Sequence, residues 1–133
     1  MLKLTPQQRR LLDEPNLAHF ATLMKDGSPQ STPLWVEYDG EYILVNTAEG
    51  RQKPRNVRRD PRVTLSVVDR NAPTKYVEIR GRVVDLIHEG AYDHLTKLAL
   101  KYAGPRARNP SPDGEIRVIV KIEPLHVTGM GLD

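Results

Sequence analysis

Apolar and polar residues alternate along three segments of the chain, and this pattern restricts the fold more than any other feature of the sequence. The segments are RVTLSVV (62–68), YVEIRGRVV (76–84) and IRVIVKIE (116–123). Because successive side chains of a strand point to opposite faces of a sheet, a period of two predicts strands that are buried on one face. In the last segment the pattern places Ile116, Val118, Val120 and Ile122 on the buried face.

Three further strands are predicted in the first half of the chain. They cover Asn16–Met24, Gln30–Tyr38 and Glu41–Thr47. Asp39-Gly40 lies between the second and the third, and this dipeptide is a strong signal for a β-hairpin. Pro33 lies inside Gln30–Tyr38, and proline cannot donate a backbone hydrogen bond to a sheet. We therefore expect Pro33 at a sheet edge, at a bulge, or where the sheet opens.

Helix signals occur at three places. Thr5 and Pro6 are a capping residue and a first-turn proline, and they predict a short helix that ends near Asp13. Pro54 predicts a second helix through about Arg59, and apolar residues at helical spacing predict a third over about residues 89–102. Residues 103–115 are rich in proline and glycine, so we expect a loop there.

These elements predict a mainly β chain of the α+β class. Six strands joined mostly by tight turns favour an antiparallel barrel or sandwich with two to three peripheral helices. A parallel sheet would need a long crossover between most neighbouring strands. The length of 133 residues suits a single domain over residues 1–133.

Composition excludes several kinds of chemistry. The chain has no cysteine, which rules out disulfides, thiolate metal sites and cysteine catalysis. The four histidines lack the spacing of a helical zinc site, so we expect no metal site. There is no nucleophile elbow, Walker loop or G-x-G-x-x-G motif, so the catalytic residues stay unknown. No segment has the roughly 20 apolar residues of a membrane span. The N-terminus also lacks the apolar core of a signal peptide, so we expect a cytoplasmic protein.

Positive charge is concentrated between residues 51 and 62. This segment holds six cations and one acid, although the net charge of the whole chain is only +3. Arg58, Arg59 and Arg62 fall near the C-terminal end of the predicted helix, where cations are favourable. A nucleic-acid surface would usually interleave aromatic residues, and this segment has none. We therefore expect no nucleic-acid partner.

Arg51, Lys53 and Arg55 surround Pro54 at the opposite end of that helix. We expect Lys53 to be extended, because it precedes a proline, and Pro54 to be the first helical residue. The amides of residues 55–57 would then lack intrahelical partners, and the helix dipole is positive there. Cations at this end are unfavourable alone, so they predict an anion site of the kind that binds phosphate.

The motifs and their order resemble the pyridoxamine 5'-phosphate oxidase-like split-barrel superfamily, and within it the branch that uses the deazaflavin coenzyme F420. The resemblance rests on DGSPQSTPLWVEYDG (26–40), ILVNTAEGRQKPRNVRRDPRVTLSV (43–67) and YVEIRGRV (76–83). It covers about Thr5 to Met130, and its most specific part is Asn46 to Pro61. The resemblance implies a homodimer of six-stranded antiparallel split β-barrels with cofactor sites at the subunit interface.

The resemblance also implies residue roles. Arg51 and Lys53 match the cations that hold the cofactor phosphate, and the charge of Arg55, with that of Arg106 and Arg108, exceeds what one phosphate needs. This excess favours F420, which carries an anionic glutamyl tail, over FMN, which ends at its phosphate. The other matched positions are polar contacts near the helix (Asn46, Thr47, Asn56), the strand beside the ring system (Gln30, Thr32, Pro33, Leu34) and a region from the other subunit (Tyr76).

The function that follows is an F420-dependent oxidoreductase. Reduced deazaflavin would deliver a hydride to an electron-poor unsaturated small molecule such as an enone, a quinone or a tetrapyrrole. Two alternatives share the same site: an FMN-dependent oxidase or flavin reductase, and a non-catalytic protein that binds F420 or FMN.

Overall fold

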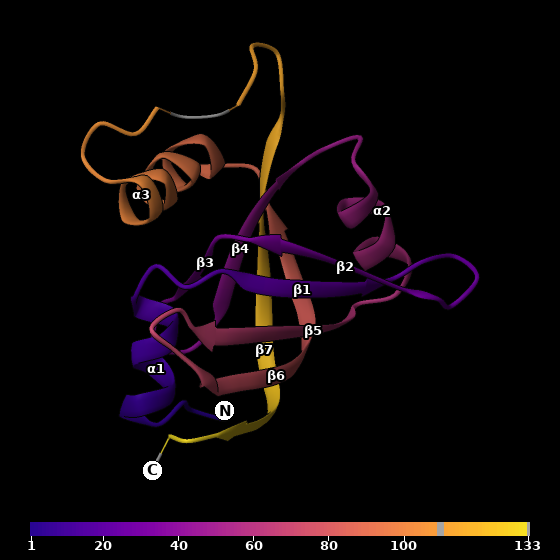
Figure 1. Ribbon diagram of the computed structural model, residues 1–133. Coiled ribbons are helices and arrows are strands. Elements are labelled where there is room, and N and C mark those ends of the chain that lie inside the picture. The colour runs from indigo at the N-terminus through magenta and orange to yellow at the C-terminus, as the bar shows by residue number, and fades with distance from the viewer. Residues whose placement is uncertain (109–110, 133) are drawn as a thin grey trace.

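One antiparallel sheet dominates the computed structural model, which describes residues 1–108 and 111–132 (Figure 1). Its seven strands lie in the order β2-β1-β5-β6-β7-β4-β3. They are β1 (Ala18–Leu23), β2 (Pro29–Leu34), β3 (Val36–Tyr38), β4 (Ile43–Ala48), β5 (Arg62–Asp69), β6 (Ala72–Ile87) and β7 (Arg117–Met130). The helices are α1 (Pro6–Asp13), α2 (Gln52–Arg59) and α3 (Ala91–Ala103). The mainly β class and the helices are confirmed, whereas the predicted number of six strands is wrong.

The seventh strand arises because Gln30–Tyr38, predicted as one strand, is divided at Trp35. β2 pairs with β1 and β3 pairs with β4, so two consecutive strands lie at opposite edges of the sheet. The backbone N–H of Val36 donates to the hydroxyl of Tyr102 at 3.2 Å, and the rings of Trp35 and Tyr102 stack with centroids 5.5 Å apart. The chain is thus held by α3 at the point where it changes edges. Pro33 lies in an edge strand, one of its predicted places.

β6 and β7 are longer than predicted, at 16 and 14 residues (Figure 1). Their pairing continues through Pro124 because the register shifts beside it, between Arg80 and Gly81. A Cβ atom at position 81 would lie 2.6 Å from the carbonyl oxygen of Glu123, so only glycine permits this approach. At the start of β7, Val118 is buried as predicted, whereas Ile116 is 61% exposed.

The three helices surround the sheet (Figure 1). Thr5 caps α1 through a capping box with Gln8, and α1 ends at Asp13 as predicted. α1 contributes Leu11 and Leu12 to the core, which is otherwise built from strand residues and Val57 of α2. No helix within residues 1–108 and 111–132 is long and apolar enough to cross a membrane.

The segment between α3 and β7 contains no helix or strand in its described part, in agreement with the predicted loop. Two residues of that predicted loop, Asn109 and Pro110, lie outside the described residues.

Candidate functional site

α2 begins at Gln52 rather than at Pro54, so the predicted helix start is wrong. Arg51 is the N-cap, and Lys53 is helical instead of extended. A proline in the first turn removes an amide hydrogen that has no intrahelical acceptor, so the third helical position tolerates it. This offsets the bias against helical backbone before proline. The amides without intrahelical partners are therefore those of Gln52 and Lys53, not those of residues 55–57.

The N-terminal end of α2 carries positive charge without a capping group. Arg51 makes no side-chain capping bond, and the first turn contains no acid. Lys53 is half-buried, and within the described residues no acceptor lies within hydrogen-bonding distance of its Nζ. Burial, and then the charge of Arg51, lower the pKa of the Lys53 ammonium. Lys53 is thus the cation at this end that lacks a counter-charge.

The remaining arginines of α2 have partners. Arg55 donates to the carbonyl of Gly50 and to Gln52 Oε1, each at 3.2 Å. Arg58 forms a two-bond pair with Glu49 at 2.7 and 2.6 Å. These cations need no ligand, which matches the expectation for Arg58 and differs from that for Arg55.

Asn56 fixes α2 to the sheet. It is completely buried, and its Nδ2 donates to Thr22 Oγ1 of β1 at 2.9 Å. Its Oδ1 accepts from Gln52 Nε2 and from Arg59 Nη2, both at 2.7 Å. These bonds define a structural position for Asn56, and its matched role in cofactor binding stays a prediction.

A cavity of about 280 Å³ lies beside the start of α2. It is open to solvent and lies between the β2–β3 corner, β4, β7 and α3, and its lining residues are Pro33, Leu34, Trp35, Asn46, Arg51, Leu95, Leu98 and Arg117. Five of the lining side chains are apolar, and two guanidinium groups and an amide complete the lining. The cavity therefore suits a planar apolar group that carries an anionic or polar substituent.

The inner face of β2 leads from α2 to this cavity. Gln30, Thr32 and Leu34 alternate with more exposed residues, and Gln30 pairs with Thr22, the partner of Asn56. Gln30 Oε1 and Thr32 Oγ1 are buried without any hydrogen-bond partner in the described chain. Buried polar atoms of this kind are rare in native proteins, and a bound polar group is one explanation for them.

A hydrogen-bond chain supports the far wall of the cavity. Arg117 Nε donates to Asn46 Oδ1 at 2.9 Å, which turns the amide nitrogen of Asn46 toward Ala91 O and His94 Nδ1. Because His94 Nδ1 accepts this bond, its Nε2 carries the hydrogen that is donated to Glu37 Oε1 at 3.1 Å. The chain joins β7, β4, α3 and β3. Thr47, next to Asn46, is buried and pairs with Val118 of β7.

Glu37 should make the stability of this wall dependent on pH. The hydrogen bond from His94, followed by that from Lys97, holds the pKa of Glu37 at about 2, although burial raises it. A lowered folded-state pKa adds stability above the unfolded value near 4.5, and this stability disappears as the pH falls toward 2. We expect Glu37→Gln to lower the free energy of unfolding by about 2 kcal/mol at pH 7 and by much less at pH 2.5. Urea unfolding at both pH values measures this, with the exposed Glu41→Gln as control. A pH-independent difference between wild type and Glu37→Gln would contradict the assignment.

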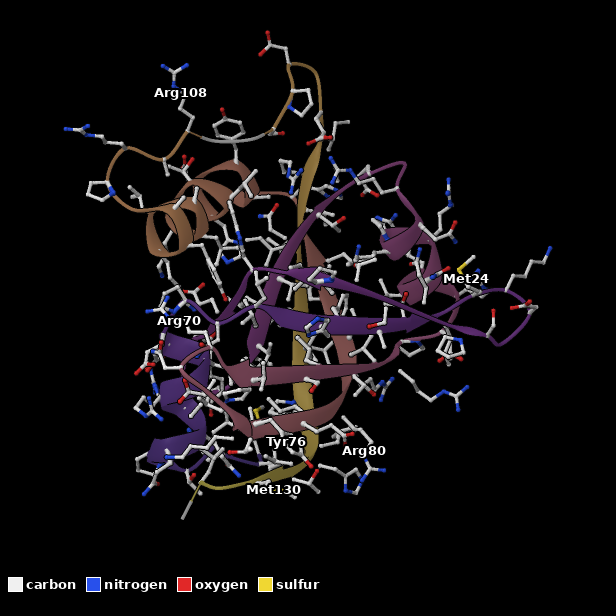
Figure 2. All side chains as sticks on the ribbon, in the orientation of Figure 1. Met24, Arg70, Tyr76, Arg80, Arg108 and Met130 are labelled. Carbon is white, nitrogen blue, oxygen red and sulfur yellow. The ribbon has the colours of Figure 1, made fainter. Side chains whose placement is uncertain are left out.

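Tyr76 lies away from the site within one chain. It is in β6, where it pairs with Val68 and Met130, and Figure 2 shows it at the end of the molecule that carries Met130, far from Met24 beside α2. Within a single chain the structure brings together Pro33, Leu34, Asn46 and Arg51, but not Tyr76. A role for Tyr76 at this site requires a second copy of the chain.

Sequence reasoning missed Arg117 and the leucines of α3. Period two placed Arg117 on the outer face of its strand, but its side chain is only 7% exposed because α3 packs against β7. Leu95 was predicted only as one of the apolar residues at helical spacing, and Leu98 was not predicted to have any role. The signal in the sequence was the predicted amphipathic helix over about residues 89–102, because its apolar face must pack against some part of the sheet.

A larger cavity of about 350 Å³ lies elsewhere. It is mostly apolar, and its residues come chiefly from β1, β5, β6 and β7. It contains none of the predicted site residues, so we assign the site to the smaller cavity, which four of them line: Pro33, Leu34, Asn46 and Arg51.

The sheet order, the edge-to-edge crossing at Trp35 and the cationic start of α2 define a split-barrel protein with a cationic corner. Residues 4–131 match the pyridoxamine 5'-phosphate oxidase family, and the chain belongs to that family.

Solved structures agree with this assignment. An F420 reductase is 34% identical, with 94% of this chain and 98% of the other covered and a TM-score of 0.84. A putative pyridoxamine 5'-phosphate oxidase from Listeria innocua is 16% identical over 91% of this chain and 93% of the other, with a TM-score of 0.67. A conserved hypothetical protein from Mycobacterium tuberculosis is 22% identical over 97% of this chain and 85% of the other, with a TM-score of 0.72. The last two show the fold alone.

Proposed function

We propose that this protein is an F420-dependent oxidoreductase that reduces an electron-poor unsaturated small molecule, such as an enone, a quinone or a tetrapyrrole. The observation that carries the proposal is the cavity that joins Arg51 to Pro33 and Leu34, in a chain that is 34% identical to an F420 reductase over almost its whole length. When bound, the reduced deazaflavin would supply the hydride.

The residues present fit such a cofactor. Arg51, Lys53 and the free amides at the start of α2 would hold its phosphate, because no side chain caps this end of the helix and its first turn contains no acid. Gln30 Oε1 and Thr32 Oγ1 are unpaired buried atoms that would bond the polar edge of a ring. Arg55, Arg106 and Arg108 offer further charge for an anionic tail, and this favours F420 over FMN.

The chain's own contribution is binding, orientation and exclusion of water. Pro33, Leu34 and Trp35 would pack along one side of the cavity, and Leu95 and Leu98 of α3 along the other. Asn46 is fixed by Arg117 and His94, so its position is set before a ligand arrives. No side chain is assigned as a proton donor, and solvent would supply the proton.

The proposal includes a cytoplasmic homodimer. Tyr76 of one copy would approach the site of the other, which is the reason for keeping Tyr76 among the cofactor-binding residues. Light scattering of the purified protein measures its mass, and a monomer at micromolar concentration would remove Tyr76 from the site.

Binding titrations with F420 and with FMN test the function. We expect F420 to bind more tightly than FMN, and reduced F420 to be oxidised when an enone or a quinone is added. FMN binding without F420 binding would replace the proposal by an FMN-dependent oxidase or flavin reductase. F420 binding without turnover of any unsaturated substrate would favour a non-catalytic cofactor-binding protein.

A further inference from the structure

Glu115 holds a carboxylate against the cation that the proposed function assigns to the cofactor phosphate. Its Oε2 accepts from Arg51 Nη2 at 2.6 Å. Its Oε1 accepts from Arg117 Nη1 at 2.6 Å and from the Ser111 hydroxyl at 2.7 Å. One carboxylate therefore bridges the N-cap of α2 and the first residue of β7.

The two arginines that bind Glu115 differ in how easily a ligand can replace the carboxylate. The Arg117 side chain is 7% exposed and is also held by Asn46, whereas the Arg51 side chain is 54% exposed. Within the described residues, Glu115 is the one side chain that forms a hydrogen bond or an ion pair with the Arg51 guanidinium. A ligand can therefore take Arg51 from Glu115 while Arg117 and Ser111 keep the carboxylate in place.

Any anion that binds Arg51 must replace an existing charge-assisted bond. A ligand carboxylate would replace one carboxylate–guanidinium bond by another, so the net gain in binding free energy would be small. The ligand would still lose translational and rotational entropy on binding. A phosphate group differs, since its additional oxygens can engage Lys53 and the free amides of α2 while one oxygen binds Arg51.

We propose that Glu115 is a specificity-determining residue of this site: as an internal anion on Arg51, it excludes monoanionic carboxylates and admits phosphate groups. This inference rests on the proposed function, in that both place the anionic group of the ligand at Arg51. The new element is that Glu115 competes with the ligand for Arg51 and thereby determines which anion binds. Ser111, together with Arg117 and Arg51, holds the pKa of Glu115 at about 2, so the competitor keeps its charge at neutral pH.

The test compares Glu115→Gln with wild type in titrations with inorganic phosphate and with acetate. The readout is the ¹⁵N resonance of Arg51 Nε, which reports the guanidinium directly. We expect phosphate to bind Glu115→Gln about tenfold more tightly, the equivalent of one charge-assisted bond. Acetate should shift the Arg51 resonance in Glu115→Gln but not in wild type.

Glu49→Gln is a matched control. It removes the same charge from a glutamate paired with Arg58 on the same helix, so it reproduces the change in net charge without freeing Arg51. We expect it to change phosphate affinity by less than about twofold, because Glu49 pairs with Arg58 and His88 and not with Arg51. Equal effects of the two variants, an unchanged preference for phosphate over acetate, or no phosphate binding to Glu115→Gln would overturn the proposal.

A second measurement uses wild type alone, in case Glu115→Gln does not fold. Saturation with phosphate should move the carboxyl ¹³C resonance of Glu115, and a static resonance would overturn the inference. Parallel F420 and FMN titrations separate the two proposals. If neither cofactor binds but the Arg51 response persists, the proposed function fails and the role of Glu115 stands. If F420 binds wild type and Glu115→Gln equally, the role of Glu115 fails alone.

Discussion

Replacing Arg51 and Lys53 together by alanine is expected to weaken F420 binding by at least about 100-fold. Each cation would make a charge-assisted contact with the cofactor phosphate, and such contacts contribute about 1.5–3 kcal/mol each. Lys53 has no acceptor in the described chain, and Arg51 is largely exposed, so their removal should change folding stability by less than about 1 kcal/mol. Fluorescence titration of F420 measures the affinity, and thermal unfolding measures the stability.

The control for this experiment is Arg58→Ala combined with Arg62→Ala. It removes the same net charge from the same basic segment, but these arginines pair with Glu49 and Asp60. We expect its F420 affinity to fall by less than about threefold at physiological salt, where charges more than about 8 Å apart are screened. If both double variants lose affinity equally, the segment attracts anions only through its overall charge, and the site is not at the start of α2.

Asn56→Ala is expected to lower the free energy of unfolding by about 3 kcal/mol. The residue is completely buried, and its loss leaves Thr22 Oγ1, Gln52 Nε2 and Arg59 Nη2 without their partner inside or beside the core. Because Asn56 is the buried side chain that bonds α2 to β1, hydrogen exchange of the α2 amides should also accelerate. Urea unfolding and amide exchange measure the two effects.

Gln52→Ala serves as the comparison for Asn56→Ala, since it removes only one of the bonds to Asn56 and should cost about 1 kcal/mol. Comparing these two variants also shows whether Asn56 positions α2 or contacts the ligand directly. A loss of stability with F420 affinity intact at low temperature supports positioning of α2. Unchanged stability with a large loss of F420 affinity would make Asn56 a direct ligand contact instead.

Local patterns predicted most of the elements. The Thr5-Pro6 cap with Gln8 is a signal contained within four residues, and α1 begins and ends where it indicated. Alternation found β5 and parts of β6 and β7, because one-sided burial is recorded in each strand's own sequence. Of the cations singled out around Pro54, Arg51 lines a cavity together with the predicted residues Pro33, Leu34 and Asn46, and their role in cofactor binding stays a prediction.

What failed depended on contacts between distant segments. The break at Trp35 is caused by Tyr102, which takes the Val36 amide from 66 residues away. The start of α2 was misplaced because proline is allowed at several positions of a first turn. Arg117 looked like a surface cation, and only the packing of α3 makes it part of the cavity wall. The partner of Arg51, Glu115, comes from a loop whose sequence gives no indication of its position.

The crossing at Trp35 leaves β2 as a free edge, and the composition of that edge limits how the protein can associate. Backbone groups of residues 29, 31 and 33 share one side of β2, and two of these residues, Pro29 and Pro33, have no amide hydrogen. An incoming strand would therefore find a single N–H donor, that of Ser31, along this side. Such an edge resists extension of the sheet by another chain, including the continuous ladders of aggregates. Two copies would therefore not pair through β2, and side chains on their faces offer another contact, where a cofactor can lie between them.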